Sequence, residues 1–539
     1  MVAMIKSNEK QRGVNPASTA NLTEDSKLRN TLIFGVSLIF LMVLFRTAWI
    51  SDDANITFRV VVNFINGSGP VYNLLERVQA YTHPLWFLFL SAGALIFTPS
   101  STAFLLSIIF SVGAVVILAR FAASNLNIVI IGLAIVFSKA FVDYSTSGLE
   151  SPLSHFLIAT MALCVCSSKD NFSNAKLLNI SFLLGCVYLT RPDLVLLFFP
   201  LFIYLTVTEL KHRKRLFYVY APALFLCASW IIFALVYYGM PFSNTAYAKL
   251  ATQIPSGKLF QQGLLYFLDS FLLDPLTLSA VLVSLVIAFT SKSKPVLMLA
   301  LGICIYLFYV AKVGGCFMSG RFFTPPFILG LTIIARKNIT ISECTIYCIA
   351  ALLLGMPTLQ YTLLAQKDYY LDRWSSAGIA DERGYYFRKS SLYNFSRDFF
   401  NSMVQTENMH LRFLDKPTSV QSAGGGIGFA AMGSAPSDHW IDICGLCDPL
   451  LSKLPIDNNK RWRIGHFVRT IPKGYFESIR QNKNLIEDPE IHKFYDCIRS
   501  LTRDQLFTKE RLMNIYNFNL KRIPWPDKAT YQKDVVEKG

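Results

Sequence analysis

Residues 31–53 read TLIFGVSLIFLMVLFRTAWISDD, an apolar run that ends abruptly in polar residues. The run over residues 31–50 has about twenty residues, enough for a helix to cross the hydrocarbon core of a bilayer. A cleaved signal peptide usually has a shorter apolar core and a small-residue cleavage site, whereas here Ser51, Asp52 and Asp53 follow directly. We therefore interpret residues 31–50 as a retained first transmembrane helix, preceded by a polar cytoplasmic N-terminus over residues 1–30.

The composition of the 539-residue chain also indicates a membrane protein. Hydrophobic residues make up 53% of it and aromatic residues 14%, which is too apolar for a soluble protein of this length. The formal net charge of +16 would suit nucleic acid only if the basic residues gathered on one soluble face. Many of them lie instead in short loops between apolar runs, as in proteins whose helices they orient in a bilayer. We predict a lipid-bilayer environment and no nucleic-acid partner.

About twelve apolar runs occur before residue 364, which predicts a polytopic α-helical membrane domain over residues 31–364 with about 11 to 13 transmembrane helices. Basic loops should be cytoplasmic: 27–29, 211–215, 292–294 and 336–337. Counting spans from these loops places residues 51–84, 144–150 and 191–193 outside, on the same side as the tail. The counts disagree between residues 85 and 144, where three runs occur and an even number is needed. Either the run 85–98 or the run 126–137 is therefore not a simple span.

The tail, residues 365–539, lacks any run of bilayer length and predicts a soluble periplasmic domain. Its size allows a core of its own. The glycine run 424–428, a short apolar strand at 441–443 and a helix over 489–511 favour a small α/β domain. Cys444 and Cys447 form a C-x-x-C, but a metal site would need a second pair. We expect no metal and no cofactor, the alternative being a divalent ion held by the Asp52 and Asp53 pair. We expect incidental cysteines, the alternative being a local disulfide if the tail is extracytoplasmic.

Ten short motifs occur along the chain in a fixed order. They are DDANITFR (52–59), GSGPVYN (67–73), ERVQAYTHPLW (76–86), SGLES (147–151), RPD (191–193), YYGMP (237–241), NTAYAKL (244–250), SGRFF (319–323), IDICGLCDP (441–449) and GH (465–466). Together they resemble the GT-C glycosyltransferase-like membrane proteins, the group of the mycobacterial terminal arabinofuranosyltransferase, the flagellar motor control protein ZomB and the Legionella protein LphB. The chain departs from this family at residues 317–320, where the family tends to show an acid, and at the two tail cysteines.

The resemblance implies a GT-C-like fold and the transfer of a sugar from a polyprenyl-phosphate donor to an extracytoplasmic glycan or lipid acceptor. An Asp pair at a bilayer boundary usually marks only a solvated helix end, but such an enzyme needs a carboxylate at that height. Asp52 or Asp53 can deprotonate an acceptor hydroxyl or stabilise positive charge at the anomeric carbon. Adjacent side chains point in different directions, so one Asp is expected to act and the other to position it, with Asp52 slightly favoured.

Cations near the same surface suit the phosphate of the donor, because guanidinium and ammonium groups bind phosphate oxygens. The candidates are Arg59, Lys249, Arg321 and His83. The sugar or acceptor pocket is expected to include Tyr72, Tyr81, Glu150, Asp193 and Tyr247, with Trp86 as a further stacking residue. The alternatives are that these cations are snorkelling side chains, that the aromatic residues form an interfacial belt, and that the acids are structural.

Two other functions are alternatives, although neither of the features that a transporter needs is evident in the sequence. A non-catalytic inner-membrane factor could assemble or control a surface machine such as the flagellar motor, with the tail as its partner-binding part. A transporter would need broken or charged helices at the membrane centre and a repeat between halves. The glycosyltransferase remains the leading prediction, located in the cytoplasmic membrane with the tail in the periplasm.

Overall fold

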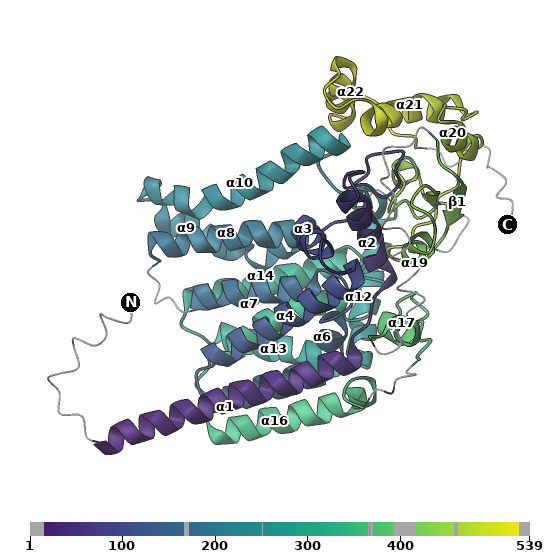
Figure 1. The fold of residues 1–539 in the computed structure, drawn as a ribbon. Coiled ribbons are helices and arrows are strands. Elements are labelled where there is room, and N and C mark those ends of the chain that lie inside the picture. The colour runs from purple at the N-terminus through teal and green to yellow at the C-terminus, as the bar shows by residue number, and fades with distance from the viewer. Residues whose placement is uncertain are drawn as a thin grey trace.

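The computed structural model describes residues 16–166, 172–250, 252–364, 366, 370–392, 416–457 and 462–527. Figure 1 shows a bundle of roughly parallel helices with the tail at one end. The bundle comprises α1 (Pro16–Thr47), α3 (Pro84–Ala94), α4 (Pro99–Phe121), α5 (Asn125–Phe137), α6 (Lys139–Tyr144), α7 (Ser151–Cys166), α8 (Asn174–Thr190), η1 (Pro192–Leu197), α9 (Phe199–Glu209), α10 (Arg213–Tyr238), α12 (Ser256–Leu273), α13 (Pro275–Phe289), α14 (Lys294–Lys312), η2 (Arg321–Phe323), α15 (Thr324–Ala335), α16 (Ile341–Gly355) and η3 (Met356–Tyr361).

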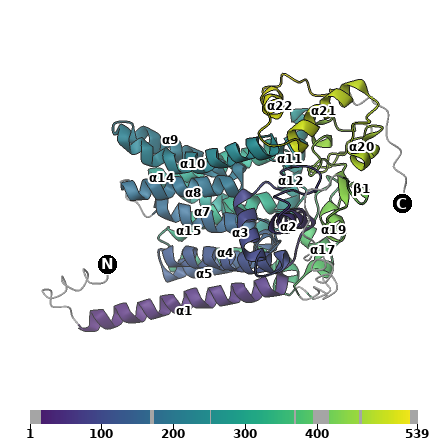
Figure 2. The same cartoon turned by 45° about the horizontal axis from the view of Figure 1, so that its top comes forward.

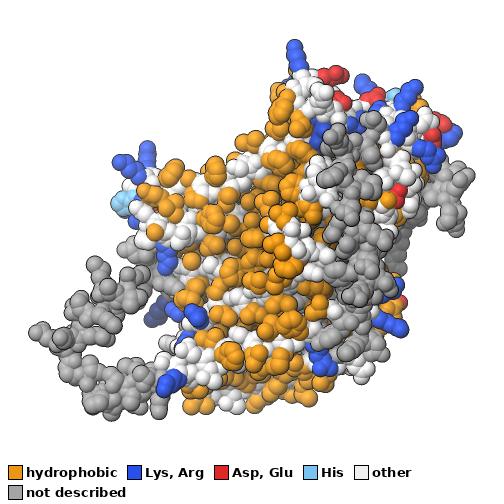
Figure 3. Space-filling model, in the orientation of Figure 1, with side chains coloured by type: hydrophobic (Ala, Val, Ile, Leu, Met, Phe, Trp, Pro, Cys, Tyr) orange, Lys and Arg blue, Asp and Glu red, His pale blue; other side chains and the backbone are white. Residues whose placement is uncertain are grey.

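The lengths and compositions of these helices confirm a multi-pass membrane protein. Among the described residues, five helices are long and apolar enough to cross a bilayer: Asp25–Thr47, Pro99–Phe121, Arg213–Tyr238, Lys294–Lys312 and Ile341–Tyr361. The pair α12 and α13 passes the same test together but is bent by 109°. The described residues also include shorter apolar helices of 10–17 residues. Hydrophobic side chains accordingly cover the visible side of the bundle, and basic side chains gather towards its ends (Figure 3).

The structure shows which of the three apolar runs between residues 85 and 144 is not a transmembrane span. Helix α3 has 11 residues and rises only about 16 Å, too little to span a bilayer. Helix α4 runs to the start of α1, where Arg29 donates a hydrogen bond to the Ala122 carbonyl at 2.6 Å. Helices α5 and α6 then return, and Trp49 at the end of α1 donates to the Asp143 carbonyl at 2.7 Å. The run 85–98 is therefore not a span, and α5 with α6 makes one crossing.

The segment after α1 folds as a helix rather than an open loop. Ser51 caps α2 (Asp52–Ile65) by accepting a hydrogen bond from the Ala54 amide at 3.3 Å. Most of α2 is buried, because it lies across the end of the bundle with the tail on its other side (Figures 1 and 2). We call this the α2 end of the bundle.

The tail packs against the α2 end and contains little sheet. Its elements are α17 (Glu382–Ser390), β1 (Val420–Ala423), α19 (Ile427–Met432), β2 (His439–Asp442), η4 (Leu451–Lys453), α20 (Tyr475–Gln481), α21 (Pro489–Arg503) and α22 (Lys509–Asn519), and α11 (Asn244–Leu250) of the preceding domain lies beside them. Strands β1 and β2 pair in parallel, with Val420 opposite His439. The helix predicted over residues 489–511 is broken between α21 and α22. Tail residues such as Ile427, Ala431 and Phe467 belong to the same hydrophobic core as the bundle.

Candidate active site

Asp52 joins α2 to the tail. Its carboxylate accepts hydrogen bonds from the amides of Gly428 at 3.1 Å and Phe429 at 2.7 Å, at the start of α19. Burial raises the pKa of Asp52 to about 6, although the Phe429 amide opposes that rise. Both oxygens of Asp52 are therefore occupied by a structural contact.

Asp53 has a different environment although it is the next residue. Its side chain is partly exposed, and no hydrogen bond or ion pair joins it to another residue that the structure describes. It interacts electrostatically with several titratable groups: His83, Arg321, Glu382, Arg463 and His466. The geometry thus favours Asp53 over Asp52, the slightly preferred candidate from the sequence, as the carboxylate available to a substrate.

Glu150 is the common acidic partner of three basic residues of the site. Its carboxylate accepts a hydrogen bond from Arg321 Nη2 at 2.8 Å and lies 3.3 Å from His83 Nδ1 and 3.7 Å from Arg191 Nε. Burial would raise the pKa of Glu150, but Arg321, His83 and Arg191 outweigh it and lower that pKa to about 2. His83 Nε2 in turn lies 2.9 Å from Thr57 Oγ1, one helical turn after Asp53 on α2.

Asp193 is linked to Glu150 through Arg191. Its carboxylate accepts two hydrogen bonds from Arg191, at 3.2 and 2.6 Å, and one from the Tyr306 hydroxyl at 3.2 Å. Arg191 was not among the predicted site residues, although it precedes Asp193 in the RPD motif. Asp193 therefore positions Arg191 beside Glu150.

Arg321 is a predicted phosphate ligand that the structure places against Glu150 and in electrostatic interaction with Asp53. Gly320 before it has a φ of 74°, which a side chain would strain, and this turn directs Arg321 to Glu150. One edge of the guanidinium is occupied by Glu150, whereas the buried Nε has no hydrogen-bond partner among the described residues. Arg321 thus keeps donor capacity for a ligand.

Arg59 lies apart from this network. Its five N–H donors have five acceptors: the carbonyls of Tyr72, Ala431, Pro436 and Asp438 and the hydroxyl of Ser434. The prediction that Arg59 binds phosphate therefore lacks structural support, because this side chain holds the tail against α2.

The predicted sugar-binding aromatics also have other contacts. Tyr72 is fully buried and donates to the Ile427 carbonyl at 3.1 Å. Tyr81 stacks on Phe87 and shares a hydrogen bond with Tyr238, while Trp86 donates to the Gly148 carbonyl at 3.1 Å. Tyr247 packs against Trp525 and the ammonium of Lys453. These four side chains form the frame of the α2 end rather than the surface around Asp53.

Lys249 meets tail residues that the sequence analysis did not select. Its ammonium lies 5.8 Å from the centre of the Phe317 ring, and the guanidinium of Arg463 lies 5.1 Å from the same ring. His466 contacts Phe317 edge to face at 4.4 Å. In the sequence, only the Gly-His motif at residues 465–466 pointed to His466. No local pattern distinguished Arg463 from the other arginines of the tail.

Glu382 supplies a second carboxyl group near Asp53. It lies 3.7 Å from Arg463 Nη2 and is buried at the start of α17. Burial, followed by repulsion from Asp53, raises the pKa of Glu382 to about 8 although Arg463 opposes the rise. Glu382 is therefore mainly protonated at neutral pH, so that Asp53 does not face a second negative charge there.

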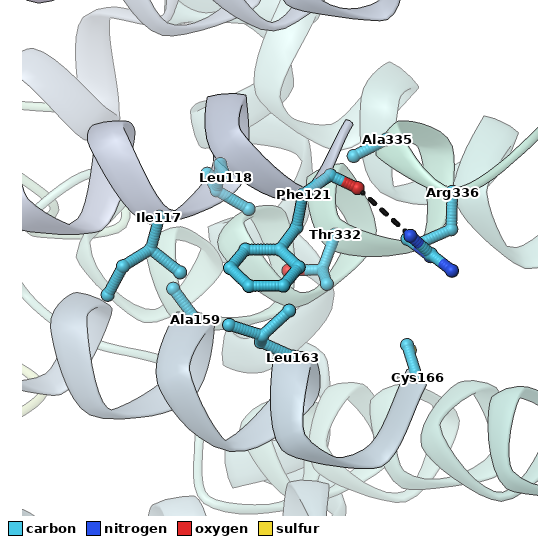
Figure 4. Close-up of a pocket in the computed structure, with 9 residues that line it drawn as sticks. All are labelled: Ile117, Leu118, Phe121, Ala159, Leu163, Cys166, Thr332, Ala335 and Arg336. Atoms are coloured by element: carbon cyan, nitrogen blue, oxygen red, sulfur yellow. Dashed lines mark hydrogen bonds between the residues drawn. The ribbon is translucent and has the colours of Figure 1, made fainter. Parts of the chain in front are cut away.

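Neither a cluster of metal ligands nor the apolar cavity adds a second charged site among the described residues. Among the residues with described positions, no three His, Cys, Asp or Glu side chains converge as metal ligands would. A small apolar cavity lies at the opposite end of the bundle, where Arg336 donates to the Phe121 carbonyl at 3.3 Å (Figure 4). Its lining contains no carboxylate: Ile117, Leu118, Phe121, Ala159, Leu163, Cys166, Thr332, Ala335 and Arg336. The acidic and basic side chains described above lie at the α2 end instead.

The fold and this site define a multi-pass α-helical membrane protein with a charged site at one end of its bundle. No protein-family model matches the chain. Over 255 residues it is 31% identical to the terminal β-(1→2)-arabinofuranosyltransferase of Mycobacterium tuberculosis, covering 43% of this chain and 39% of the relative. Over 445 residues it is 25% identical to the enzyme of the same name from Corynebacterium glutamicum, covering 73% and 63%. The chain thus spans less than two thirds of each relative, and these matches confirm the resemblance seen in the motifs.

One solved structure resembles this chain, with lower sequence identity than the two relatives. The crystal structure of ArnT from Cupriavidus metallidurans bound to undecaprenyl phosphate matches with a TM-score of 0.45 and 14% identity, covering 75% of this chain and 74% of that one. A likeness at this level leaves the activity open.

Proposed function

We propose that this protein is a membrane glycosyltransferase that moves a sugar from a polyprenyl-phosphate donor to a hydroxyl of an extracytoplasmic glycan or lipid acceptor. The observation that carries the proposal is Asp53, a partly exposed carboxylate without a bonded partner among the described residues, which interacts electrostatically with Arg321 and Arg463 at the end of an apolar bundle. A donor whose lipid lies in the bilayer would present its phosphate and sugar at this height.

In the proposed reaction, Asp53 accepts the proton of the acceptor hydroxyl as that oxygen attacks the anomeric carbon. The bond from the anomeric carbon to the phosphate oxygen breaks, and the electron pair leaves with the polyprenyl phosphate. Arg321 is well placed to stabilise this charge, because Glu150 fixes one edge of its guanidinium and Nε keeps a free donor among the described residues. His83 links Glu150 to Thr57 on α2 and so relates both groups to Asp53.

The relatives support the class of reaction, since both are named as transferases of arabinofuranosyl groups that form β-(1→2) links. The charge pattern supports the orientation. Arg29 and the basic start of α10 lie at the end opposite Asp53, which supports a cytoplasmic location for that end and a periplasmic location for the site and the tail.

The proposal can be tested in cells that lack the native gene. Wild-type protein should restore the missing envelope glycan, and Asp53→Asn, expressed at the same level in the membrane, should not. Asp496→Asn is a matched control, because Asp496 is exposed on α21. Full restoration of the glycan by Asp53→Asn would contradict the assignment, and an unchanged envelope in the absence of the protein would favour the assembly-factor alternative.

A further inference from the structure

Three basic side chains from distant parts of the sequence meet on one aromatic ring. Lys249 comes from α11, and Arg463 and His466 come from the tail; all three contact Phe317 in the segment before η2. Gly465 allows the close approach, since a Cβ at this position would lie 2.8 Å from Phe317 Cδ1. We call Lys249, Arg463 and His466 the Phe317 cluster.

Arg463 is held rigidly but keeps an open donor. Its Nε donates to the Gly378 carbonyl at 2.7 Å, and the guanidinium stacks on the Trp374 ring at 3.9 Å. The buried Nη2 has no hydrogen-bond partner among the described residues, and Glu382 lies 3.7 Å from it. An arginine fixed in this way loses little conformational freedom when it binds an anion.

The other two members of the cluster, His466 and Lys249, can also form further hydrogen bonds. His466 Nδ1 is buried and has no hydrogen-bond partner among the described residues. Lys249 has no hydrogen bond or ion pair to another residue that the structure describes, and its side chain is partly exposed. Two positive charges and an imidazole therefore meet at Phe317, Arg463 and His466 interact electrostatically with Asp53, and Arg463 Nη2 and His466 Nδ1 have no hydrogen-bond partner among the described residues.

We propose that the Phe317 cluster binds the phosphate of the lipid-linked donor, so that the tail completes the substrate site instead of only covering it. This inference rests on the proposed function for the identity of the ligand. In the complex, Arg463 of the tail and Lys249 of α11 contact phosphate oxygens, and Arg321, held by Glu150, contacts the phosphate from the bundle. The sugar then lies between the two groups of cations and beside Asp53.

The test is equilibrium binding of farnesyl phosphate, a short prenyl phosphate, to the full-length protein in detergent. Arg463→Gln and Lys249→Gln should each weaken binding by roughly tenfold or more, as expected for a lost charged hydrogen bond. Arg463→Lys should lie between Arg463→Gln and wild type. The control is Arg480→Gln, because Arg480 is exposed on α20 and pairs only with Glu477 among the described residues.

Thermal unfolding separates binding from folding. Arg463 has structural contacts and its loss can destabilise the tail, whereas Lys249→Gln removes no hydrogen bond that the structure describes. Wild-type affinity in a folded Lys249→Gln protein, together with wild-type affinity in Arg463→Gln, would overturn the inference. Prenyl phosphate binding without any sugar transfer would instead contradict the proposed function and leave the cluster assigned.

A separate observation concerns α22, whose apolar side chains face outward. Leu512, Met513 and Tyr516 are about half exposed, and Phe507 just before the helix is 76% exposed. They line a shallow surface hollow together with Lys509. Such an apolar face on a soluble surface indicates a binding partner.

The position of α22 identifies the partner as lipid. Buried Arg511 donates to the carbonyls of Val236 at 2.8 Å and Tyr237 at 3.1 Å, which ties α22 to the last turn of the spanning helix α10. In Figure 3 the hydrophobic surface of the bundle continues to the corner where Figure 1 places α22. Exposed Lys521 and Arg522 follow the helix and suit lipid phosphates. We infer that α22 lies in the headgroup region of the bilayer and anchors the tail to it.

This second inference can be tested in nanodiscs of phosphatidylethanolamine and phosphatidylglycerol with brominated acyl chains. A fluorescent amino acid in place of Met513 should be quenched strongly, and the same fluorophore in place of exposed Glu490 on α21 should not. Equal fluorescence at both positions would contradict the inference. Unquenched fluorescence at position 513 with a dimeric mass would assign this face to a second copy of the chain and also overturn it.

Discussion

Glu150 is the single residue on which the charge balance of the site depends most. It is almost fully buried and lies against Arg321, Arg191 and His83. Glu150→Gln keeps the size of the side chain but leaves buried cations without their counter-charge. We expect this change to lower the free energy of unfolding by about 3–5 kcal/mol, measured by thermal or denaturant unfolding in detergent. Glu477→Gln, which alters an exposed pair, should change it by less than about 1 kcal/mol.

The buried carboxyl of Glu382 predicts a pH dependence of stability. Its pKa in the folded protein is about 8, above the ordinary value of 4.5. As pH rises from 4.5 to 8, the unfolded chain releases this proton while the folded protein retains it, so the folded state loses stability across that window. The unfolding temperature of wild type should therefore fall relative to that of Glu382→Gln over this range. Parallel curves for the two proteins would contradict the shifted pKa.

At the scale of elements, the contact between α2 and α19 fixes the position of the Asp pair. A Cβ on Gly428 would lie 1.9 Å from the Asp52 carbonyl oxygen, so the two helices must separate to accommodate one. Gly428→Ala should cost about 1–3 kcal/mol of stability and reduce transfer, because Asp52 loses its amide partners. Gly257→Ala is the control, since nothing lies within 4 Å of a Cβ there. An unchanged unfolding temperature in Gly428→Ala would show that the contact is unimportant.

The sequence predicted the elements that depend on local pattern and missed those that depend on distant contacts. Apolar runs predicted the spanning helices, and the basic loops predicted that Asp53, Arg321, Lys249 and the tail meet at one end. The partner of Asp52 lies 376 residues away, so no local pattern separated a capping Asp52 from a free Asp53. Arg59 and Arg463 look alike in sequence. Only the fold shows that four carbonyls and the Ser434 hydroxyl occupy the donors of Arg59, whereas Arg463 Nη2 has no hydrogen-bond partner among the described residues.

At the scale of the whole molecule, part of the tail belongs to the hydrophobic core of the bundle, while residues such as Leu450, Tyr475 and Ile498 form a second core mostly within the tail. Trp440, Cys447 and Phe467 of the tail belong to the cluster that contains the bundle residues. We therefore expect a chain truncated after residue 364 to aggregate or be degraded rather than persist as a folded membrane domain, as judged by size-exclusion chromatography in detergent. Recovery of a monodisperse truncated protein with wild-type thermal stability would contradict a shared core.

The central claim is that Asp53 acts as the base in sugar transfer from a lipid phosphate, and the most direct measurement is transfer by purified protein in nanodiscs. The donor is a radiolabelled polyprenyl-phosphate arabinofuranose, chosen from the names of the relatives, and the acceptor is envelope glycan from cells lacking the protein. We predict that Asp53→Asn folds, binds farnesyl phosphate and transfers label about 10²–10⁴-fold more slowly than wild type, while Asp496→Asn is unaffected. Transfer by Asp53→Asn at the wild-type rate would contradict the claim.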